Sequence, residues 1–394
     1  MRVALDVRPL QTENQYRGIG TYVRELLIQY LTKQREVVLF AWPEIPISLD
    51  PKYLNLCQIY EIPKPSDFPG MKYLGFRHDA NNNLEAFKKL ATVADLIHFT
   101  NVIDIQMGFP MVDLGVPRIA TVHDITAVTH PQYCFYNSNF LKFATLRFLY
   151  SKIVQNHSAL DGIITISQYT DNSLRFNLKN SPPTRIVWNG ISDRFVLPYA
   201  SQVNEYRQRR RLPAKFILHV GTLLGVKNVE AILQATAPQC PWPFVFAGPY
   251  SKEDQLYLVK KFPHQQIVWM GYVDKEELPM LYAAAGLFAF PSLMEGFGLP
   301  LLEAMAVGTP VVCSNTSCLP EVAGNAAVMF DPHNLGDVRN ALLGVMNDEN
   351  LRMQMRTRGL ERAQHMSWRR TADMTWMAYE AFLEEYQRRR SKKR

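Results

Sequence analysis

The feature that most constrains the fold is an alternation of short apolar runs with segments of helical periodicity. Strands that are apolar on both faces and separated by helices are typical of parallel, doubly wound sheets. The sequence therefore predicts an α/β protein. The predicted strands are 2–7, 36–42, 94–99, 118–124 and 162–167 in the first half, and 216–221, 244–248, 267–272, 287–292 and 311–314 in the second half.

The length of 394 residues and the 47% of hydrophobic residues favour two domains of ordinary size. Regular periodicity is lost over 191–214, a segment with prolines and a cluster of arginines, and we place the hinge there. We expect two Rossmann-like domains, 1–195 and 196–367, facing a central cleft. An amphipathic C-terminal helix of about 368–394 is expected to pack back on the first domain. Open parallel sheets bind ligands at the carboxyl ends of their strands, so the site should lie there.

The formal net charge is +7 and the pI is near 9.0, which favours anionic partners without specifying one. We expect no nucleic-acid partner. Much of the excess lies in the last few residues, which we interpret as a solvated end, with contact to anionic lipid as the alternative. These basic residues are Arg388, Arg389, Arg390, Lys392, Lys393 and Arg394.

The five cysteines are odd in number, widely spaced and without a C-x-x-C motif, which favours a reducing compartment. The start, MRVALDVRPL, is too short and too charged for a signal peptide. No apolar run approaches the ~18 residues that a membrane span needs. We therefore expect a soluble, cytoplasmic protein.

Two acids, Glu295 and Glu303, lie on either side of a Gly-Phe-Gly turn in the stretch SLMEGFGLPLLEAMAVGTPVV. The glycines allow positive φ, and Pro300 suits the first turn of a helix, so a helix should begin near 299. Its N-terminus would attract an anion, phosphate above all. Because acids repel phosphate, their natural targets are the hydroxyl groups of a sugar. The pattern indicates a site for a nucleotide sugar.

Two other interpretations of this acid pair stay open from the residues alone. Glu303 could merely complement the helix dipole while Glu295 is a solvated loop acid. The two acids could also be a glycosidase pair, although one short loop-helix unit is a poor way to flank a scissile bond.

The sequence does not match several common nucleotide-binding and metal-binding motifs. Gly18-Ile19-Gly20 has Val23 where a dinucleotide fingerprint needs its third glycine, and GTLLGVK at 221–227 has the wrong spacing for a P-loop. The chain has no D-x-D and no His/Cys cluster with ligand spacing. We expect no cofactor and no catalytic metal, with a nucleotide sugar as co-substrate.

The chain resembles the retaining glycosyltransferases of family 4, which adopt the GT-B fold. The resemblance is carried by the segment from 267 onward, whose Glu295 and Glu303 meet the family's E-x7-E signature. Supporting motifs are RGIGTYVREL at 17, TVHDI at 121, ITISQYT at 164, VWNGI at 187 and GTLLGVKN at 221. The resemblance covers nearly every predicted element.

The resemblance implies roles for individual residues. Glu295 would contact the donor sugar near the reacting carbon, Glu303 would hold the ribose, and His123 would lie near the acceptor hydroxyl, with Asp124 beside it. Taken alone, a histidine at a strand end is more often structural. The catalytic set is His123, Lys227 and Glu295. The donor-binding set is Gly18, Gly20, Gly221, Thr222, Gly271, Tyr272, Gly296, Phe297, Gly298, Leu299 and Glu303.

One departure from the family concerns its usual Arg and Lys in the loop after the first strand of the second domain. Thr222 and Val226 stand at the two positions where relatives place the Arg, while Lys227 is retained. Three interpretations stay open: Arg17 supplies the charge across the cleft, the enzyme is slow, or it needs a particular donor.

The resemblance implies transfer of a hexose with retention, from a donor of the UDP-glucose or GDP-mannose type, in cell-surface polysaccharide synthesis. The acceptor would be a saccharide or a lipid-linked saccharide. The competing interpretations are a nucleotide-sugar-binding partner protein without catalysis, and an epimerase or inverting transferase on the same fold. The E-x7-E signature argues against the last two.

A predicted helix over 139–154 mixes aromatic with basic side chains. Core packing is the preferred explanation of its aromatics, and a surface for lipid or a lipid-linked acceptor is the alternative. Peripheral contact with the inner face of the plasma membrane therefore stays open. The residues are Phe140, Phe143, Phe148 and Tyr150 with Lys142, Arg147 and Lys152.

Overall fold

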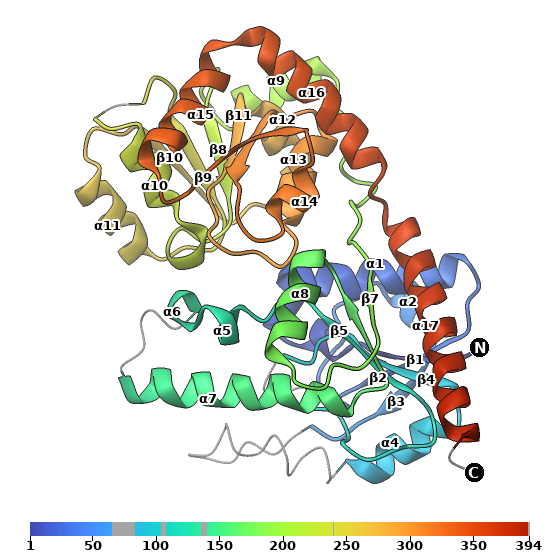
Figure 1. Ribbon diagram of the computed structural model, residues 1–394. Helices are drawn as coiled ribbons and strands as arrows, with labels where there is room; N and C mark the ends of the chain where they lie inside the picture. Colours follow the sequence, from blue (N-terminus) through green and yellow to red (C-terminus); the bar gives the residue numbers. More distant parts are fainter. Residues whose placement is uncertain (65–82, 104–107, 135–139, 239, 393–394) are drawn as a thin grey trace. The chain divides into compact units, whose positions relative to one another are not determined.

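The structure, a computed structural model, describes residues 1–64, 83–103, 108–134, 140–238 and 240–392. It divides into two compact units, Met1–Gly190 with Trp368–Arg394, and Ile191–Ser367 (Figure 1). The division falls after Gly190 rather than at the expected 195. Ile191 forms a β-bridge with Ser367, and its N–H donates to the Met366 carbonyl, so this part of the linker belongs to the second unit.

The first unit is built on a seven-stranded parallel sheet of order β3-β2-β1-β4-β5-β6-β7. The strands diverge in both directions from the neighbours β1 and β4, as expected for a doubly wound sheet. The strands are β1 (Val3–Asp6), β2 (Val37–Ala41), β3 (Gln58–Glu61), β4 (Leu96–Phe99), β5 (Arg118–Val122), β6 (Gly162–Thr165) and β7 (Thr184–Ile186).

Helices and single helical turns surround this sheet. The α-helices are α1 (Gly18–Thr32), α2 (Pro51–Leu54), α4 (Leu84–Ala91), α5 (Thr126–Thr129), α6 (Pro131–Cys134), α7 (Phe140–Asn156), α8 (Gln168–Asn177) and α17 (Trp368–Ser391). The 3-10 turns are η1 (Arg8–Gln11), η2 (Glu13–Tyr16) and η3 (His157–Ala159).

The second unit repeats the design with a six-stranded parallel sheet of order β10-β9-β8-β11-β12-β13. The strands are β8 (Ile217–Val220), β9 (Phe244–Ala247), β10 (Ile267–Gly271), β11 (Leu287–Phe290), β12 (Val311–Ser314) and β13 (Ala327–Phe330). The helices are α9 (Ala200–Arg209), η4 (Gly225–Lys227), α10 (Val229–Ala235), α11 (Lys252–Lys261), α12 (Leu278–Ala284), α13 (Leu299–Ala306), α14 (Leu319–Ala323), α15 (Leu335–Asn347) and α16 (Glu349–Gln364).

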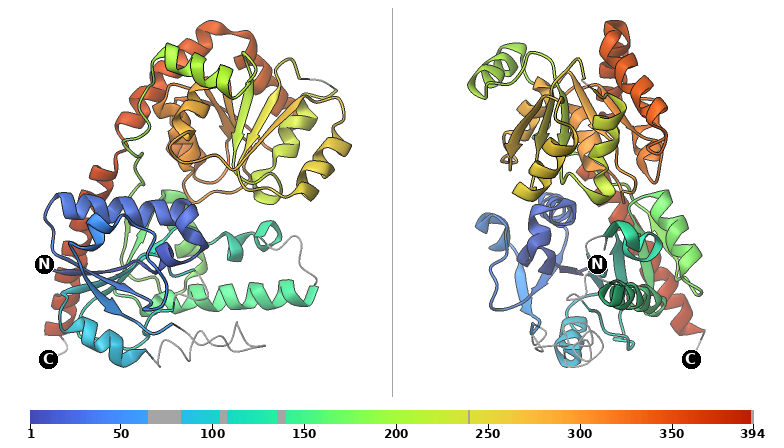
Figure 2. Two further views of the ribbon diagram at one scale, coloured as in Figure 1. Left: turned by 180° about the vertical axis from the view of Figure 1, so that it is seen from behind. Right: turned by 90° about the vertical axis from the view of Figure 1, so that its left-hand side faces the viewer.

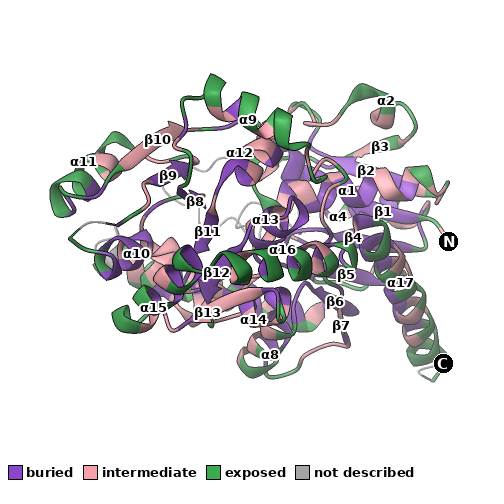
Figure 3. Ribbon diagram, turned by 90° about the horizontal axis from the view of Figure 1, so that it is seen from above, coloured by how far each residue is buried: buried purple, intermediate pink, exposed green. Residues whose placement is uncertain are grey.

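Burial follows strand position in both sheets (Figure 3). The inner strands β1, β4, β5, β9, β11 and β12 are buried throughout, whereas the edge strands β3, β7, β10 and β13 are exposed in part. The prediction of buried parallel strands is confirmed for the inner strands. The edge strands β3 and β7 were not predicted, because a partly exposed strand lacks a continuous apolar run. The edge strand β13 was also not predicted, although its four residues, AVMF, are all apolar.

The last helix, α17, packs on α1 of the first unit (Figure 2). The hydroxyl of its Tyr379 lies 2.6 Å from Nδ1 of His98 in β4 and accepts a hydrogen bond of 3.1 Å from Tyr30 of α1. Arg35 donates to the Ala372 carbonyl and pairs with Asp373 at 2.8 Å. The end of the chain thus completes the core of the unit with which the chain begins.

The basic end of α17 is not simply solvated. Arg389 donates to the Asp161 carbonyl at 3.2 Å, and Arg390 donates to the Gly115 carbonyl at 2.8 Å. Both side chains are nevertheless exposed, which agrees with the interpretation of a solvated end, and the two hydrogen bonds additionally hold α17 against the rest of the first unit. Lys393 and Arg394 lie outside the described residues.

The preference for core packing is wrong for two of the four aromatic side chains of α7, while Phe143 and Tyr150 are half-buried. Phe140 and Phe148 are 82% and 60% exposed, whereas Leu146 and Ile153 are buried. The helix buries one side and leaves aromatic side chains on the other. In the part of the chain that the structure describes, no helix is both long and apolar enough to cross a membrane.

The segment 191–214, predicted as a hinge without periodicity, contains the helix α9. Tyr206 is its one buried side chain, and Arg210 pairs with Glu277 at the start of α12. Because α9 is mostly exposed and polar, its sequence lacks an apolar stripe. Packing on α12 and charge pairing hold it instead.

Candidate functional site

The two central strands of the second sheet, β8 and β11, are the neighbours from which the strand order diverges. Loops leaving such a pair at the carboxyl edge separate and leave room for a ligand, which is where open α/β sheets bind nucleotides. The loop after β8 contains 221–228, and the loop after β11 contains 291–298. These two loops hold five of the eleven predicted donor-binding residues together with Lys227 and Glu295, and α13 holds Leu299 and Glu303.

Lys227 and Glu295 meet between these loops. Lys227 Nζ donates to Glu295 Oε1 at 2.6 Å and lies 5.2 Å from the centroid of the Phe290 ring. The two side chains are only 21% and 14% exposed. The Leu293 N–H also donates to the Val226 carbonyl, which ties the loops together. A partly buried ammonium therefore lies at the centre of the site, paired with a carboxylate until an anion competes for it.

The loop after β8 is supported by a buried histidine. Gly221 has φ of +142°, and the exposed Thr222 follows it. Nε2 of His219 lies 3.0 Å from the Thr222 carbonyl oxygen. Burial lowers the pKa of His219 to about 4, and the nearby Lys227 charge also lowers it. His219 is thus neutral at pH 7 and adds no charge to the site.

The Gly-Phe-Gly turn leads into α13, which begins at Leu299 as predicted. Gly298 has φ of +94°, and a Cβ there would lie 2.9 Å from Leu319, so glycine is needed for both conformation and space. Phe297 is buried and anchors the turn, while Gly296 and Leu299 are partly exposed. The first N–H groups of a helix lack intrahelical partners, which makes this terminus a place for a phosphate.

Glu303 lies one turn into α13, and its carboxylate accepts a hydrogen bond of 2.9 Å from the Tyr282 hydroxyl. Tyr282 is itself buried, and its carbonyl accepts from the Thr309 hydroxyl at 2.7 Å. Burial raises the pKa of Glu303 to about 7, although the Tyr282 hydrogen bond and the charges of Arg194 and Lys275 lower it in part. Sequence reasoning missed Tyr282, because it lies in an apolar run.

The Gly271-Tyr272 turn follows β10. Gly271 has φ of +67°, and its N–H donates to the Tyr250 hydroxyl at 2.7 Å. The Tyr272 side chain is 61% exposed. An exposed aromatic ring on a braced turn has a free face on which a base can stack.

The predicted residues of the first unit lie at the carboxyl edge of its sheet. His123 follows β5 and is buried, and its Nε2 donates to the Thr100 carbonyl at 2.9 Å. The Tyr22 ring packs edge-on at 5.0 Å, and burial lowers the pKa of His123. A neutral imidazole that donates from Nε2 keeps Nδ1 as an acceptor. Asp124 accepts from the N–H of Thr126, the first residue of α5, at 2.9 Å.

Gly18 and Gly20 begin α1, and Gly18 is exposed. A Cβ at Gly20 would lie 2.5 Å from the Asn14 carbonyl oxygen, so this glycine is required for packing against η2. Arg17 precedes them with an exposed side chain that lies 3.9 Å from Glu13 Oε2.

Among the residues that the structure describes, no group of three or more His, Cys, Asp or Glu is arranged to hold a metal ion. The expectation that no catalytic metal is needed stays a prediction.

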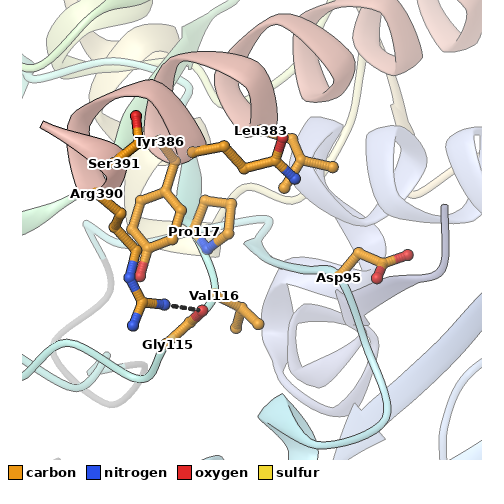
Figure 4. A pocket seen from close by; sticks show the side chains of 9 residues that line it. Asp95, Gly115, Val116, Pro117, Leu383, Tyr386, Arg390 and Ser391 are labelled. Carbon is orange, nitrogen blue, oxygen red and sulfur yellow. Dashed lines mark hydrogen bonds between the residues drawn. The ribbon is translucent and has the colours of Figure 1, made fainter. Parts of the chain in front are cut away.

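A separate pocket of about 530 Å³ lies at the opposite, amino edge of the first sheet, where β4 and β5 begin (Figure 4). The Arg390 guanidinium donates to the Gly115 carbonyl beside it. The pocket contains none of the predicted site residues. It is lined by Asp95, Gly115, Val116, Pro117, Leu383, Tyr386, Gln387, Arg390 and Ser391.

The two sheets and the loops at their carboxyl edges are those of a glycosyltransferase. Residues 16–195 match the family model described as Glycosyltransferase Family 4, and residues 202–362 match the model described as Glycosyl transferases group 1. The chain belongs to this family of glycosyltransferases, and its fold is GT-B.

Relatives by sequence include the O-antigen chain mannosyltransferase B of Escherichia coli, 32% identical over 272 residues that cover 66% of this chain and 69% of that one. The serotype-specific mannosyltransferase WbdA of Escherichia coli is 24% identical over 415 residues, or 98% of this chain. The chain spans only about half, 49%, of the length of WbdA.

Solved structures share the fold at low sequence identity. Sucrose-phosphate synthase from Thermosynechococcus elongatus superposes with a TM-score of 0.75 at 20% identity, covering 98% of this chain and 100% of that one. Anabaena HepE, solved in complex with UDP and glucose, has a TM-score of 0.70 at 15% identity, covering 97% of this chain and 100% of that one.

Proposed function

We propose that the protein is a retaining hexosyltransferase of the mannosyltransferase type. It moves a hexose from a nucleoside diphosphate sugar, with GDP-mannose the favoured donor, to a saccharide or lipid-linked saccharide acceptor. The setting is polysaccharide synthesis in the bacterial cytoplasm. The observation that carries the proposal is the pair of Lys227 and Glu295, 2.6 Å apart beside the N-terminus of α13. The names of the O-antigen mannosyltransferases support the choice of sugar.

The ammonium of Lys227 stabilises the leaving diphosphate. Negative charge grows on the diphosphate as its bond to the sugar breaks, and a fixed cation in a partly buried site lowers the energy of that state. The N–H groups at the start of α13 add positive potential from the other side. When the phosphate draws Lys227 away, Glu295 is released to bind the hydroxyls of the sugar.

The remaining residues position the substrates. Glu303 accepts hydrogen bonds from the ribose hydroxyls, and Tyr272 stacks on the base. His123 presents Nδ1 as an acceptor for a sugar or acceptor hydroxyl. The acceptor hydroxyl attacks the face that the diphosphate leaves, and the departing phosphate takes its proton, as is proposed for the family.

Calorimetric titration with GDP, UDP and ADP tests the donor. We expect GDP to bind at least about tenfold more tightly than the other two, since the base contacts discriminate while the diphosphate contacts are shared. In Lys227→Ala, the affinities for GDP, UDP and ADP should all fall by a similar factor. Tighter binding of UDP would contradict the choice of donor, and binding of none of the three would contradict the nucleotide-sugar site itself.

The second candidate function is a nucleotide-sugar-binding partner protein without catalysis. It is favoured by Thr222 and Val226, which leave the loop after β8 with one cation, Lys227, where the family resemblance implies two. Transfer assays separate the two candidates. Tight binding of GDP with no transfer and no hydrolysis of GDP-mannose would establish the binding protein.

We also propose that the exposed side of α7 rests on an anionic membrane surface. This side carries Phe140, Arg147, Phe148 and Lys152, and the helix contains no acidic residue. Lys152 Nζ lies 5.5 Å from the centroid of the Phe148 ring, so charge and aromatic surface are adjacent. Aromatic rings and basic groups together suit the interface of an anionic bilayer.

Sedimentation with vesicles checks this contact. Binding to vesicles of phosphatidylglycerol and phosphatidylcholine should fall several-fold in Phe148→Ser and in Lys152→Glu, and should fall with added salt. Leu256→Ser, which removes an exposed apolar side chain from α11, is the control. Equal binding by all three variants, or binding to pure phosphatidylcholine, would contradict the proposal.

A further inference from the structure

Three residues of the loop between β12 and α14 form hydrogen bonds to the backbone of the loop after β11, which contains Glu295. The Thr316 hydroxyl donates to the Ser292 carbonyl at 3.2 Å. Ser317 Oγ accepts the N–H of Glu295 at 3.1 Å, and the Cys318 thiol donates to the carbonyl of Glu295 at 3.2 Å. Both backbone polar groups of Glu295 are therefore bound by one short segment, 316–318.

This support matters because Glu295 stands next to a turn with two glycines. Gly296 and Gly298 allow the backbone of the turn many conformations. The Glu295 carboxylate can occupy one position only when other contacts restrict this backbone. The Glu295 side chain points to Lys227, and that direction is set by the backbone at Glu295. A hydrogen bond to its N–H on one side and one to its carbonyl on the other fix that backbone.

Ser317 is itself in a conformation that serine rarely adopts. Its φ is +54°, in the left-handed region where glycine has no steric cost. The hydrogen bond from the Glu295 N–H to the serine hydroxyl offsets this strain. A glycine at 317 would avoid the strain but would have no oxygen to accept that hydrogen bond. Backbone strain of this kind concentrates at functional sites, where surrounding contacts hold it in place.

We propose that Ser317 is a positioning residue for Glu295. Its hydroxyl fixes the backbone from which the carboxylate reaches Lys227 and the donor sugar. The catalytic part of this inference rests on the proposed function, whereas the hydrogen bond to the Glu295 N–H does not. Sequence reasoning did not single out Ser317, because it lies in a different loop from Glu295, although both are within the segment from 267 onward that carries the family resemblance.

The test compares Ser317→Gly with Ser317→Ala. Both lose the oxygen, but only glycine relieves the strain, so Tm should hold or rise in Ser317→Gly and fall in Ser317→Ala. We expect kcat at saturating donor to fall about tenfold in both, with little change in KM for the donor. The control is Ser314→Ala, since the buried Ser314 hydroxyl in β12 has no hydrogen-bond partner; its kcat should be unchanged.

If serine matters only for stability, kcat will follow Tm, and Ser317→Gly will be as active as the wild type. That result would overturn the proposal. Hydrogen exchange at the Glu295 amide gives a readout independent of activity, and it should become faster in both Ser317 variants but not in Ser314→Ala. Should the wild type transfer no sugar, the proposed function fails. Unchanged amide exchange would instead refute the role of Ser317.

Discussion

Lys227→Ala is expected to lower kcat at saturating donor by ~10² or more. Lys227 is the cation that the structure places between the loops after β8 and β11, at 2.6 Å from Glu295. A charge pair at ~4 Å is worth roughly 4 kcal/mol at an effective dielectric near 20, which is about three decades in rate if it is felt only in the transition state. Saturating donor removes any contribution from weaker ground-state binding. The change in kcat therefore measures how far Lys227 stabilises the leaving diphosphate in the transition state.

The matched control for this variant is Lys261→Ala. Lys261 also pairs with an acid of the second unit, Glu230, but this pair joins α11 to α10, whereas the Lys227–Glu295 pair joins the two loops. We expect its kcat to stay near that of the wild type. Equal kcat values for Lys227→Ala and Lys261→Ala would show that Lys227 does not stabilise the leaving group.

Glu303→Gln is expected to stabilise the nucleotide-free protein above neutral pH. Burial raises the pKa of Glu303 from 4.5 to about 7. Between these values the folded protein holds a proton that the unfolded chain has released, so stability falls as pH rises. The cost is complete above pH 7 and amounts to up to about 3 kcal/mol. Glutamine cannot ionise and therefore escapes this cost.

Thermal unfolding at pH 5 to 8 without nucleotide measures this effect. The Tm of Glu303→Gln minus that of the wild type should grow with pH through this range, and the exposed acid Glu253 gives the control Glu253→Gln. A Tm difference that is independent of pH would contradict the raised pKa. Because ribose hydroxyls bind the ionised form, GDP should also bind the wild type more tightly at pH 8 than at pH 6, and this pH dependence should disappear in Glu303→Gln.

The inner strands and the start of α13 could be predicted from sequence because each is a local pattern. An inner parallel strand is apolar on both faces, and glycines followed by Pro300 mark a helix start at Leu299. The edge strands β3 and β7 and the exposed helix α9 carry no such pattern. Their formation depends on a neighbour to pair or pack with, and a single segment does not reveal its neighbours.

The candidate site divides in the same way. Glu295, Glu303 and Lys227 were found through motifs, but Tyr282 and Ser317, which hydrogen-bond to the two glutamates, were not. Tyr282 reaches Glu303 from α12, and Ser317 reaches Glu295 from the loop between β12 and α14, so these contacts form only when folding brings the segments together. Tyrosine in an apolar run and serine in a loop are ordinary in sequence, so only the three-dimensional contacts distinguish them.

The return of α17 to the first unit has a consequence for biosynthesis. While the ribosome is still producing the chain, the sheet formed by β1 to β7 lacks the residues of α17, including Tyr379, the partner of His98, because these are translated after the second unit. The second unit lies wholly within Ile191–Ser367, and it can finish folding first. A nascent chain released before Trp368 would therefore have a folded second unit and a first unit whose hydrophobic core is incomplete. Chaperones and proteases recognise such incompletely folded units.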